Sequence, residues 1–370
     1  MASFKADFLF RKGRIAAALA VVLAVPLAQA DVVRIGVATA GGGDPVTFSG
    51  STLGIVRNQQ LLEKAFAGSG TEVQWFFFKG AGPAVNEALS NQQLDFAYQG
   101  DLPAVVGRSN GLDTKLLAAL GVRANLYLAV PKGSPIKSIE DLKDKKVALF
   151  RGTNGHLVAI NLLAEHGLTE REIKVINLDT GSTQAALVSN GVDAAFGGRE
   201  LFKLRDKGLI DIVYDNPTQD VRYTRQTALV VRGGYEKEHP DNVQKVVDTL
   251  VDAAKWTSED SHRDAVFTEW AKSNEPAESL RADFTGVSIR DRASPLVDNF
   301  LLSRYQAVAD QAKEEKLIRR PVSIDGWFET RYLQKSLKTK GLENYWTPYG
   351  PDGKQPAGNA VAAATSKQGS

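Results

Sequence analysis

Several short loops in the N-terminal half of the chain are rich in glycine, serine, threonine and asparagine, and each follows an apolar segment and precedes a helical pattern. The first turn of a helix has backbone N–H groups without intrahelical partners and a partial positive charge, so such loops are suited to binding an anion. Any one of them could equally be an ordinary turn into a helix, and only their number favours a common polar cleft. The loops are residues 39–52, 79–83, 100–101, 151–155 and 180–183.

The candidate ligand-binding residues come from these loops and from a charged pair that follows residues 192–196. Serine and threonine hydroxyls donate hydrogen bonds, glycine allows a ligand to approach the backbone, and arginine presents two parallel donors to an oxyanion. We predict that a polar cleft is lined by Ser49, Ser51, Thr52, Gly82, Gly100, Asp101, Arg151, Gly152, Thr153, Asn154, Ser182, Arg199 and Glu200.

Several kinds of catalytic and cofactor site are disfavoured by the same sequence. None of the loops continues as the Gly-Lys-Ser or Gly-Lys-Thr of a P-loop, and no G-x-G-x-x-G opens a helix. The chain has no cysteine, and its four histidines, at positions 156, 166, 239 and 262, do not have metal-ligand spacing. No serine stands in a nucleophile elbow. We therefore expect no metal, no cofactor and no enzymatic activity.

Short apolar segments alternate with helical patterns from Val32 onward, which is typical of an α/β protein with mostly parallel sheets. After Asp241 the pattern changes to a run of helices, the first with apolar residues from Val243 to Ala254 at helical spacing and the later ones over 261–272, 276–283 and 294–316. Earlier helices are expected to begin near Ser51, Pro83, Asn154 and Thr183. We expect strands at 33–38, 73–78, 94–98, 126–130, 147–150, 174–177, 192–196 and 228–231.

An internal similarity indicates that the chain holds two related lobes. Residues 88–101 align without gaps with residues 186–199, although any two βα units share part of this pattern. We expect lobe I to comprise residues 31–124 and 228–348, with the C-terminal helices, and lobe II to comprise residues 125–227. The chain would cross between them near 126–130 and 227–231. The tail, 349–370, is expected to be disordered because it has no apolar period.

The same alignment places Arg199 opposite Asp101. In two lobes related by approximate twofold symmetry, these opposite charges would face each other across the cleft. Arg199 would then either pair with Asp101 as a latch or donate hydrogen bonds to an anionic ligand. A solvated arginine at a strand end is the third alternative.

The first 30 residues have the pattern of a secretory signal peptide. Basic residues precede an apolar stretch from Ile15 to Leu27, and Ala28-Gln29-Ala30 forms an A-x-A cleavage site. A membrane anchor is the alternative, but thirteen residues fall short of the roughly 20 that a spanning helix needs. We expect cleavage after Ala30, and the absence of cysteine excludes a lipid-modified cysteine there. A freely diffusing periplasmic protein fits these features best.

Removal of residues 1–30 leaves 41 of the 45 basic residues and 42 of the 43 acidic residues, a net charge near −1. A chain without a basic excess lacks the electrostatic footprint of a nucleic-acid-binding protein. The remaining 340 residues are more than one hydrophobic core usually supports, so two lobes are expected. No heptad stripe is present, and we expect a monomer.

Three segments resemble the aliphatic sulfonate-binding proteins of ABC importers, a group related to taurine- and nitrate-binding proteins. They are RNQQLLEKAF and VQWFFFKGAGPAVNEAL with the following GDLPAV (57–105), GSPIKSIEDLKDKKVALFRGTNGH (133–156), and EEKLIRRPVSIDGWF (314–328). The resemblance extends from about Val33 to Trp346. It implies a type II periplasmic binding protein with two lobes, each a mostly parallel sheet flanked by helices, that closes on a small organic anion and delivers it to a membrane permease.

The chain departs from the family pattern at two places. The loop from Thr39 to Ser51 is longer, and Gly198-Arg199-Glu200 replaces the Trp-Asp-Pro common in the family. These differences leave the identity of the ligand open between a sulfonate, a sulfate ester and another anion such as taurine or nitrate. A ligand sensor that reports to a membrane receptor is a further alternative.

Overall fold

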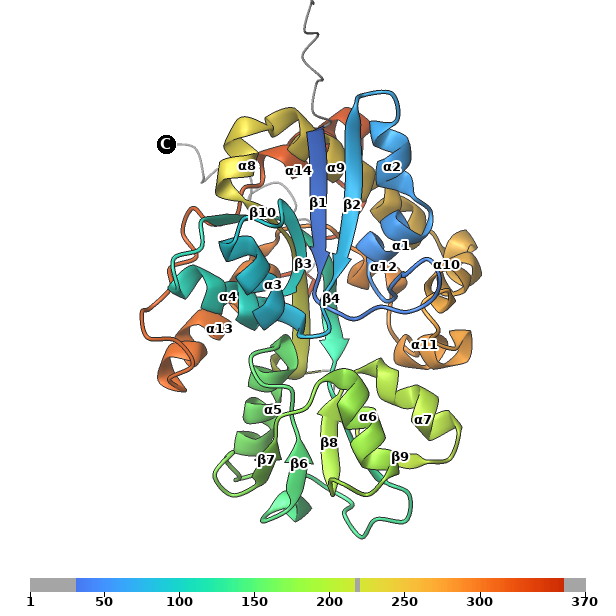
Figure 1. Ribbon diagram of the computed structural model, residues 1–370, viewed down its shortest axis with the longest axis vertical. Coiled ribbons are helices and arrows are strands. Elements are labelled where there is room, and N and C mark those ends of the chain that lie inside the picture. The colour runs from blue at the N-terminus through green and yellow to red at the C-terminus, as the bar shows by residue number, and fades with distance from the viewer. Residues whose placement is uncertain (1–30, 217–219, 356–370) are drawn as a thin grey trace, which may run out of the picture. The chain divides into compact units, whose positions relative to one another are not determined.

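A computed structural model describes residues 31–216 and 220–355 of the chain. It contains two five-stranded sheets with helices on their faces, which confirms the predicted two-lobed α/β class (Figure 1). The predicted signal peptide and residues 356–370 of the predicted tail lie outside the described residues. Lobe I denotes the first sheet and the helices packed on it, and lobe II denotes the second sheet with the helices α5 (Asn154–Glu165), α6 (Thr180–Val188) and α7 (Phe202–Asp206).

The first sheet has the strand order β2-β1-β3-β10-β4. The first three strands in this order are parallel, whereas β10 runs antiparallel to both of its neighbours. Its strands are β1 (Asp31–Val37), β2 (Thr71–Phe77), β3 (Phe96–Gly100), β4 (Thr114–Asn125) and β10 (Thr224–Arg232).

Helices cover both faces of the first sheet. Successive residues of a strand point to opposite faces, so Leu229 and Val231 of β10 join one core cluster and Ala228 and Val230 join the other. The helices of this lobe are α1 (Thr52–Asn58), α2 (Leu61–Phe66), α3 (Ala81–Ser90), α4 (Asp101–Ser109), α8 (Gly233–Glu238), α9 (Pro240–Ser258), α10 (Arg263–Ala271), α11 (Ala277–Asp283), α12 (Ile289–Arg292), α13 (Asn299–Glu314) and α14 (Arg331–Lys340).

The second sheet has the order β7-β6-β8-β5-β9, with β5 antiparallel to its two neighbours. Its strands are β5 (Tyr127–Pro131), β6 (Lys146–Ala148), β7 (Lys174–Ile176), β8 (Ala194–Gly197) and β9 (Ile210–Tyr214). The helices of lobe II are α5 (Asn154–Glu165), α6 (Thr180–Val188) and α7 (Phe202–Asp206). Four short 3-10 helices complete the described elements: Glu140–Leu142, Arg199–Leu201, Val221–Tyr223 and Asp260–His262.

The two sheets share one topology. In strand order, β2, β1, β3, β10 and β4 correspond to β7, β6, β8, β5 and β9. The aligned segments 88–101 and 186–199 contain β3 and β8, which are equivalent strands of the two sheets. The antiparallel strands β5 and β10 are the predicted crossing segments, and each is antiparallel because the chain enters its sheet from the other lobe. The exact lobe boundaries remain a prediction.

Some elements differ from those expected. Strand β4 was not predicted, because its Leu116–Leu120 run is rich in leucine and alanine, which favour helices. The helix expected from residue 294 begins at Asn299, where the Asp298 side chain accepts a hydrogen bond from Leu301 N–H (2.9 Å). Residues 349–355 of the expected tail lie within the described part of the chain, where Tyr349 N–H donates to Asp298 (2.9 Å), and the disorder of the tail stays a prediction. Within the described part of the chain, no helix is both long and apolar enough to cross a membrane.

Candidate functional site

A cavity of about 490 Å³ lies between the two lobes. It is lined by the segments that follow β1, β2, β6 and β7 and by the last residues of β3 and β8, so both sheets direct the carboxyl ends of parallel strands toward it. This edge of an open α/β sheet is the usual place for a ligand. The cavity is therefore the candidate binding site.

Seven of the thirteen candidate residues line this cavity, and they come from both lobes. They are Ser49, Gly82, Gly100, Thr153, Asn154, Arg199 and Glu200. Six do not line it: Ser51, Thr52, Asp101, Arg151, Gly152 and Ser182.

Except for Thr52, whose buried hydroxyl has no hydrogen-bond partner among the described residues, the residues that the structure places elsewhere have local structural partners. The Ser51 hydroxyl caps α1 by accepting from Leu53 N–H (3.2 Å) and donates to the Leu120 carbonyl (2.9 Å). Thr52 is buried in the first turn of α1, and Ser182 N–H donates to Asp179, the N-cap of α6 (2.9 Å). The exposed Arg151 side chain extends to Glu170 (3.5 Å).

Asp101 is buried beside the cavity and stabilises the backbone at its edge. Its carboxylate accepts hydrogen bonds from Leu102 N–H (2.7 Å) and Gln226 N–H (3.3 Å). Burial raises the pKa of Asp101 to about 6, and the Leu102 N–H opposes this shift without cancelling it. The carboxylate therefore helps to hold β10 against α4.

The N-termini of α3 and α4 approach the N-terminus of α5 across the cleft; Gly100 is the N-cap of α4. A Cβ atom on Gly100 would lie 2.7 Å from Asn154 Cβ, and one on Gly152 would lie 3.1 Å from Pro83 Cγ.

Neither α3 nor α5 has a side-chain N-cap, since Gly80 precedes α3 and the Thr153 hydroxyl donates to the Phe150 carbonyl (2.8 Å). In the first turn of α3, Ala81 N–H donates to the Phe78 carbonyl (2.9 Å) and Pro83 has no N–H, so Gly82 N–H is the donor that remains. In α5, His156 N–H donates to the Thr153 carbonyl (3.1 Å), so the N–H groups of Asn154 and Gly155 remain available to an anion.

Arg225 on β10 adds to the cavity wall a cation that is not among the residues predicted from the sequence. Its Nη2 donates to the Asn125 carbonyl (2.7 Å), and its Nε is buried without a hydrogen-bond partner among the described residues. Its Cδ lies 3.9 Å from the position a Cβ would take on Gly155, the second residue of α5. The available signal was the polar run Thr224-Arg225-Gln226-Thr227 at the start of an otherwise apolar strand.

His156 supports the loop that leads into α5. Its Nδ1 accepts a hydrogen bond from Gly152 N–H (3.2 Å), and its Nε2 lies 3.2 Å from a Glu170 carboxylate oxygen. A ring nitrogen that accepts from an N–H is unprotonated, so Nε2 is the donor to Glu170. His156 thus has a positioning role at the α5 terminus.

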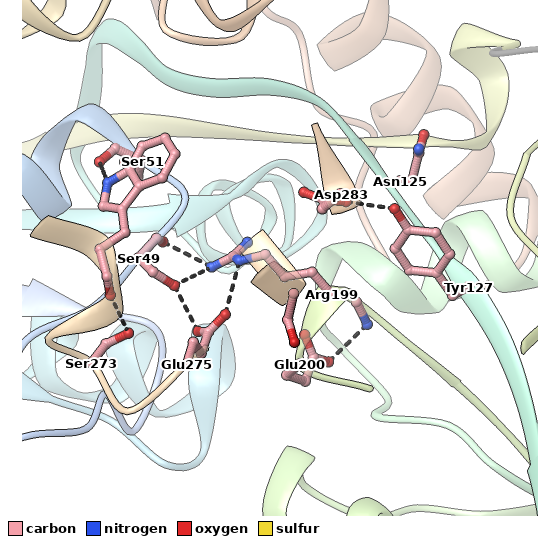
Figure 2. A network of polar contacts seen from close by, with 12 residues as sticks. Ser49, Ser51, Asn125, Tyr127, Arg199, Glu200, Ser273, Glu275 and Asp283 are labelled. Carbon is pink, nitrogen blue, oxygen red and sulfur yellow. Dashed lines mark hydrogen bonds and ion pairs between the residues drawn. The ribbon is translucent and has the colours of Figure 1, made fainter. Parts of the chain in front are cut away.

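Arg199 does not pair with Asp101, so the alternative of a latch between these two residues is wrong. Its Nε donates to Glu275 (3.1 Å), and its Nη2 donates to the carbonyl and the hydroxyl of Ser49 (2.9 and 2.8 Å; Figure 2). Ser49 lies in the long loop after β1, and Glu275 lies between α10 and α11. Both segments belong to lobe I and supply partners for Arg199. Neither segment is part of the alignment of residues 88–101 with residues 186–199, so the alignment could not predict these partners.

Apolar groups form a large part of the remaining wall. Phe48 and Tyr98 of lobe I line the cavity with ring centroids 5.3 Å apart, and Phe150 and Phe196 of lobe II line it as well. A ligand in this cavity would therefore contact hydrogen-bond donors at one part of its surface and apolar side chains at another.

Sequence and structural relatives agree with the architecture of this site. A protein of Bacillus subtilis (strain 168) named for aliphatic sulfonate binding is 25% identical over 295 residues, which cover 79% of this chain and 82% of the relative. A protein of the same name from Escherichia coli (strain K12) is 25% identical over 318 residues, or 84% and 90% of the two chains. The crystal structure of a periplasmic sulfonate-binding protein from Methylobacillus flagellatus KT is 30% identical, with a TM-score of 0.72 over 86% of this chain and 98% of that one.

The chain also has enzymes among its more distant relatives. A 2'-hydroxybiphenyl-2-sulfinate desulfinase of Rhodococcus erythropolis is 26% identical over 164 residues, or 43% of each chain.

Residues 66–263, more than half of the chain, match the family described as NMT1/THI5 like. Together with the sulfonate-binding relatives, this match confirms the resemblance found in the sequence. The chain belongs to the NMT1/THI5-like family.

Proposed function

We propose that the protein binds a small organosulfur anion, a sulfonate or a sulfate ester, and delivers it to the permease of an ABC importer. The observation that carries this proposal is the convergence of the uncapped N-termini of α3 and α5 with Arg225 at one cavity. The sulfonate-binding names of relatives that match most of the chain support the choice of anion.

The chemistry of this end of the cavity suits a tetrahedral oxyanion. A sulfonate or sulfate ester has three terminal oxygens, which accept hydrogen bonds from several directions at once. Backbone N–H groups of two helices and a guanidinium supply hydrogen-bond donors from both lobes. All of these groups are already donors at neutral pH, so no change of protonation accompanies the binding of an anion. The apolar wall formed by Phe48, Tyr98 and Phe196 accommodates the organic part of the ligand.

Delivery to a permease requires a mobile carrier outside the cytoplasmic membrane. The signal-peptide pattern of residues 1–30, with cleavage after Ala30, supports a periplasmic location. The relative from Methylobacillus flagellatus KT is named as periplasmic, which agrees with this location. We propose that the mature protein works as a monomer that alternates between ligand capture and docking on the permease.

Binding without catalysis is favoured over an enzymatic role. In sequence, the desulfinase relative matches 43% of the chain, whereas the binding-protein relatives match 79% and 84%. A desulfinase structure covers 84% of the chain at 18% identity, so the fold alone does not distinguish the two roles. The cavity wall also contains no cysteine or histidine, since the chain lacks the former and His156 is turned toward Gly152 and Glu170. A bound organosulfur anion is therefore expected to be released unchanged.

Calorimetric titration of the mature protein with alkanesulfonates, aryl sulfate esters, taurine, sulfate and nitrate tests the proposal. We expect a sulfonate or sulfate ester to bind with a Kd near the micromolar range, about −8 kcal/mol. A hydrogen bond to a charged group contributes roughly 1.5–3 kcal/mol, so Arg225→Ala should weaken binding about ten- to a hundredfold.

Arg222→Ala is the matched control, because Arg222 is exposed and pairs with Asp220 (2.7 Å) outside the cavity. Its affinity should equal that of the parent protein. Binding of a neutral sugar or a cation, with no response to any of these anions, would show that the cavity has another ligand. Conversion of a sulfonate or sulfinate into inorganic sulfur species would establish an enzyme instead.

A further inference from the structure

Arg199, Glu275 and Ser49, which we call the closure triad, join the two lobes in the wall of the cavity. Arg199 follows β8 of lobe II, whereas Ser49 and Glu275 belong to lobe I. Arg199 donates to both partners, and the Ser49 hydroxyl donates to the other Glu275 oxygen (2.6 Å). Both carboxylate oxygens of Glu275 thus have a donor, and one of the two donors comes from the opposite lobe (Figure 2).

The backbone of lobe I is adapted to this guanidinium. Gly50 has φ of +71°, and a Cβ atom there would overlap the Arg199 guanidinium. Glycine is the residue that combines a positive φ with a close approach of this kind. The adjacent Lys79–Asp179 pair also joins the lobes (3.4 Å), but the Lys79 side chain is 70% exposed, so this pair contributes little.

The closure triad places a carboxylate in the wall of an anion-binding cavity. Burial lowers the pKa of Arg199, but the charges of Glu275 and Asp283 outweigh this effect and raise its pKa above the ordinary value. The guanidinium therefore stays charged and compensates Glu275. Without Arg199, the Glu275 carboxylate would repel an anionic ligand and attract a cationic group.

We propose that Arg199 is a positioning and specificity-determining residue, which closes the lobes by neutralising Glu275 and makes the cavity prefer anions with an uncharged body over zwitterions. This inference rests on the proposed function of the cavity. Because lobe II supplies the cation and lobe I supplies the carboxylate, the Glu275 charge is compensated only when the lobes are together. Closure thereby completes a cavity that accepts an anion.

A double-mutant cycle with two matched probes tests this role. Pentane-1-sulfonate has an uncharged body, and 4-aminobutane-1-sulfonate has nearly the same length but ends in an ammonium group. We expect Arg199→Ala to weaken binding of pentane-1-sulfonate at least tenfold and to shift the preference toward the aminosulfonate at least fivefold. Glu275→Gln in the Arg199→Ala background should restore the affinity for pentane-1-sulfonate to within about threefold of the parent, because the uncompensated charge is gone.

A second measurement does not depend on the ligand. Small-angle scattering of the ligand-free Arg199→Ala protein should give a larger radius of gyration than that of the parent. The control for loss of a surface charge is Lys132→Ala, which breaks an exposed ion pair within lobe II (2.6 Å). Its sulfonate affinity and its radius of gyration should both equal those of the parent.

The inference would be overturned if Arg199→Ala lost the same affinity for both sulfonates and Glu275→Gln did not restore it. Arg199 would then be an ordinary ligand contact. Sulfonate binding by the parent protein would still stand in that case, so the proposed function would survive. Failure of the parent to bind either probe or any other organosulfur anion would remove the proposed function and this inference together.

Discussion

Two residues at equivalent positions of the two lobes, Asp101 and Arg199, have different partners. Each follows a strand that ends in glycine, and each begins a helical turn after β3 or β8. Asp101 accepts hydrogen bonds from the backbone of its own lobe, whereas Arg199 reaches across to Glu275. The shared position is set by the topology, but the partners depend on loops that differ between the lobes.

The buried carboxylate of Asp101 makes stability depend on pH. Its pKa is about 6 in the folded protein, compared with 3.8 for an ordinary aspartate, so the folded state binds the proton more tightly. The stabilisation by the protonated form is complete below about pH 4 and is lost as the pH rises through 6, with an upper limit of about 3 kcal/mol. Asp101→Asn is neutral throughout and lacks this dependence.

We therefore expect the free energy of unfolding of the parent, relative to that of Asp101→Asn, to fall by roughly 1–3 kcal/mol between pH 4 and pH 7. Urea unfolding at each pH measures this difference, and subtraction of the two proteins removes the titration of all other groups. A difference that stays constant or rises over this range would show that Asp101 is ionised at low pH in the folded state.

The sequence identified the residue types of the site better than it identified their contacts. Polar loops before helices are visible in the sequence, and the topology brings them to the carboxyl ends of the strands. For this reason the predicted residues that line the cavity include Ser49, Asn154 and Arg199. Glu275 was missed because it lies in an ordinary helix connection 76 residues from Arg199, and no periodicity links the two. Arg225 was missed because its strand was assigned from its apolar residues alone.

At the scale of elements, the site depends on how closely the N-termini of α4 and α5 approach across the cleft, at Gly100 and Asn154. Gly100 is at an ordinary φ of −73°, so alanine fits its backbone, but the new Cβ would lie 2.7 Å from Asn154 Cβ. Gly100→Ala should therefore displace the α5 terminus and weaken sulfonate binding about tenfold or more, while the unfolding temperature changes little because each lobe can keep its own packing. Titration and thermal unfolding of the same preparation measure both quantities.

Gly191→Ala is a matched control for this substitution. Gly191 is an exposed residue of lobe II, and a Cβ there would meet atoms at 3.5 Å and beyond. Its ligand affinity should remain that of the parent. Unchanged affinity in Gly100→Ala would mean that the two helix termini do not have to approach this closely for binding.

The elements that the sequence predicted correctly are those with a strong local signal. The apolar stripe of α9, from Val243 to Ala254, is buried against the first sheet as expected, and helix α5 begins at Asn154. Strands β4 and β9 were missed because their assignment depends on pairing with β10 and β5, which are distant in sequence. Strand pairing of this kind is a tertiary property that short windows do not contain.

At the scale of the whole molecule, the described part of the chain has lobes that share core contacts. Leu157 and Ile160 of α5 belong to a core cluster that otherwise consists of residues of lobe I, including Leu102 and Leu301. Tyr127 of β5 donates to Asp283 at the end of α11 (2.5 Å), and Asp283 pairs with the buried Arg292 (2.7 Å). These contacts make separate unfolding of one lobe costly, because it would expose apolar surface and leave buried charges without partners.

We therefore expect a single cooperative thermal transition, with equal calorimetric and van't Hoff enthalpies. A ligand that binds only the folded state at a hundred times its Kd adds about 2.7 kcal/mol, which for a protein of this size raises the midpoint by roughly 4 °C. Differential scanning calorimetry with and without saturating sulfonate measures both predictions. Because the donors come from both lobes, the ligand should move the whole transition without splitting it. Two transitions, of which the ligand moves only one, would show that the lobes unfold independently and that one lobe alone holds the anion.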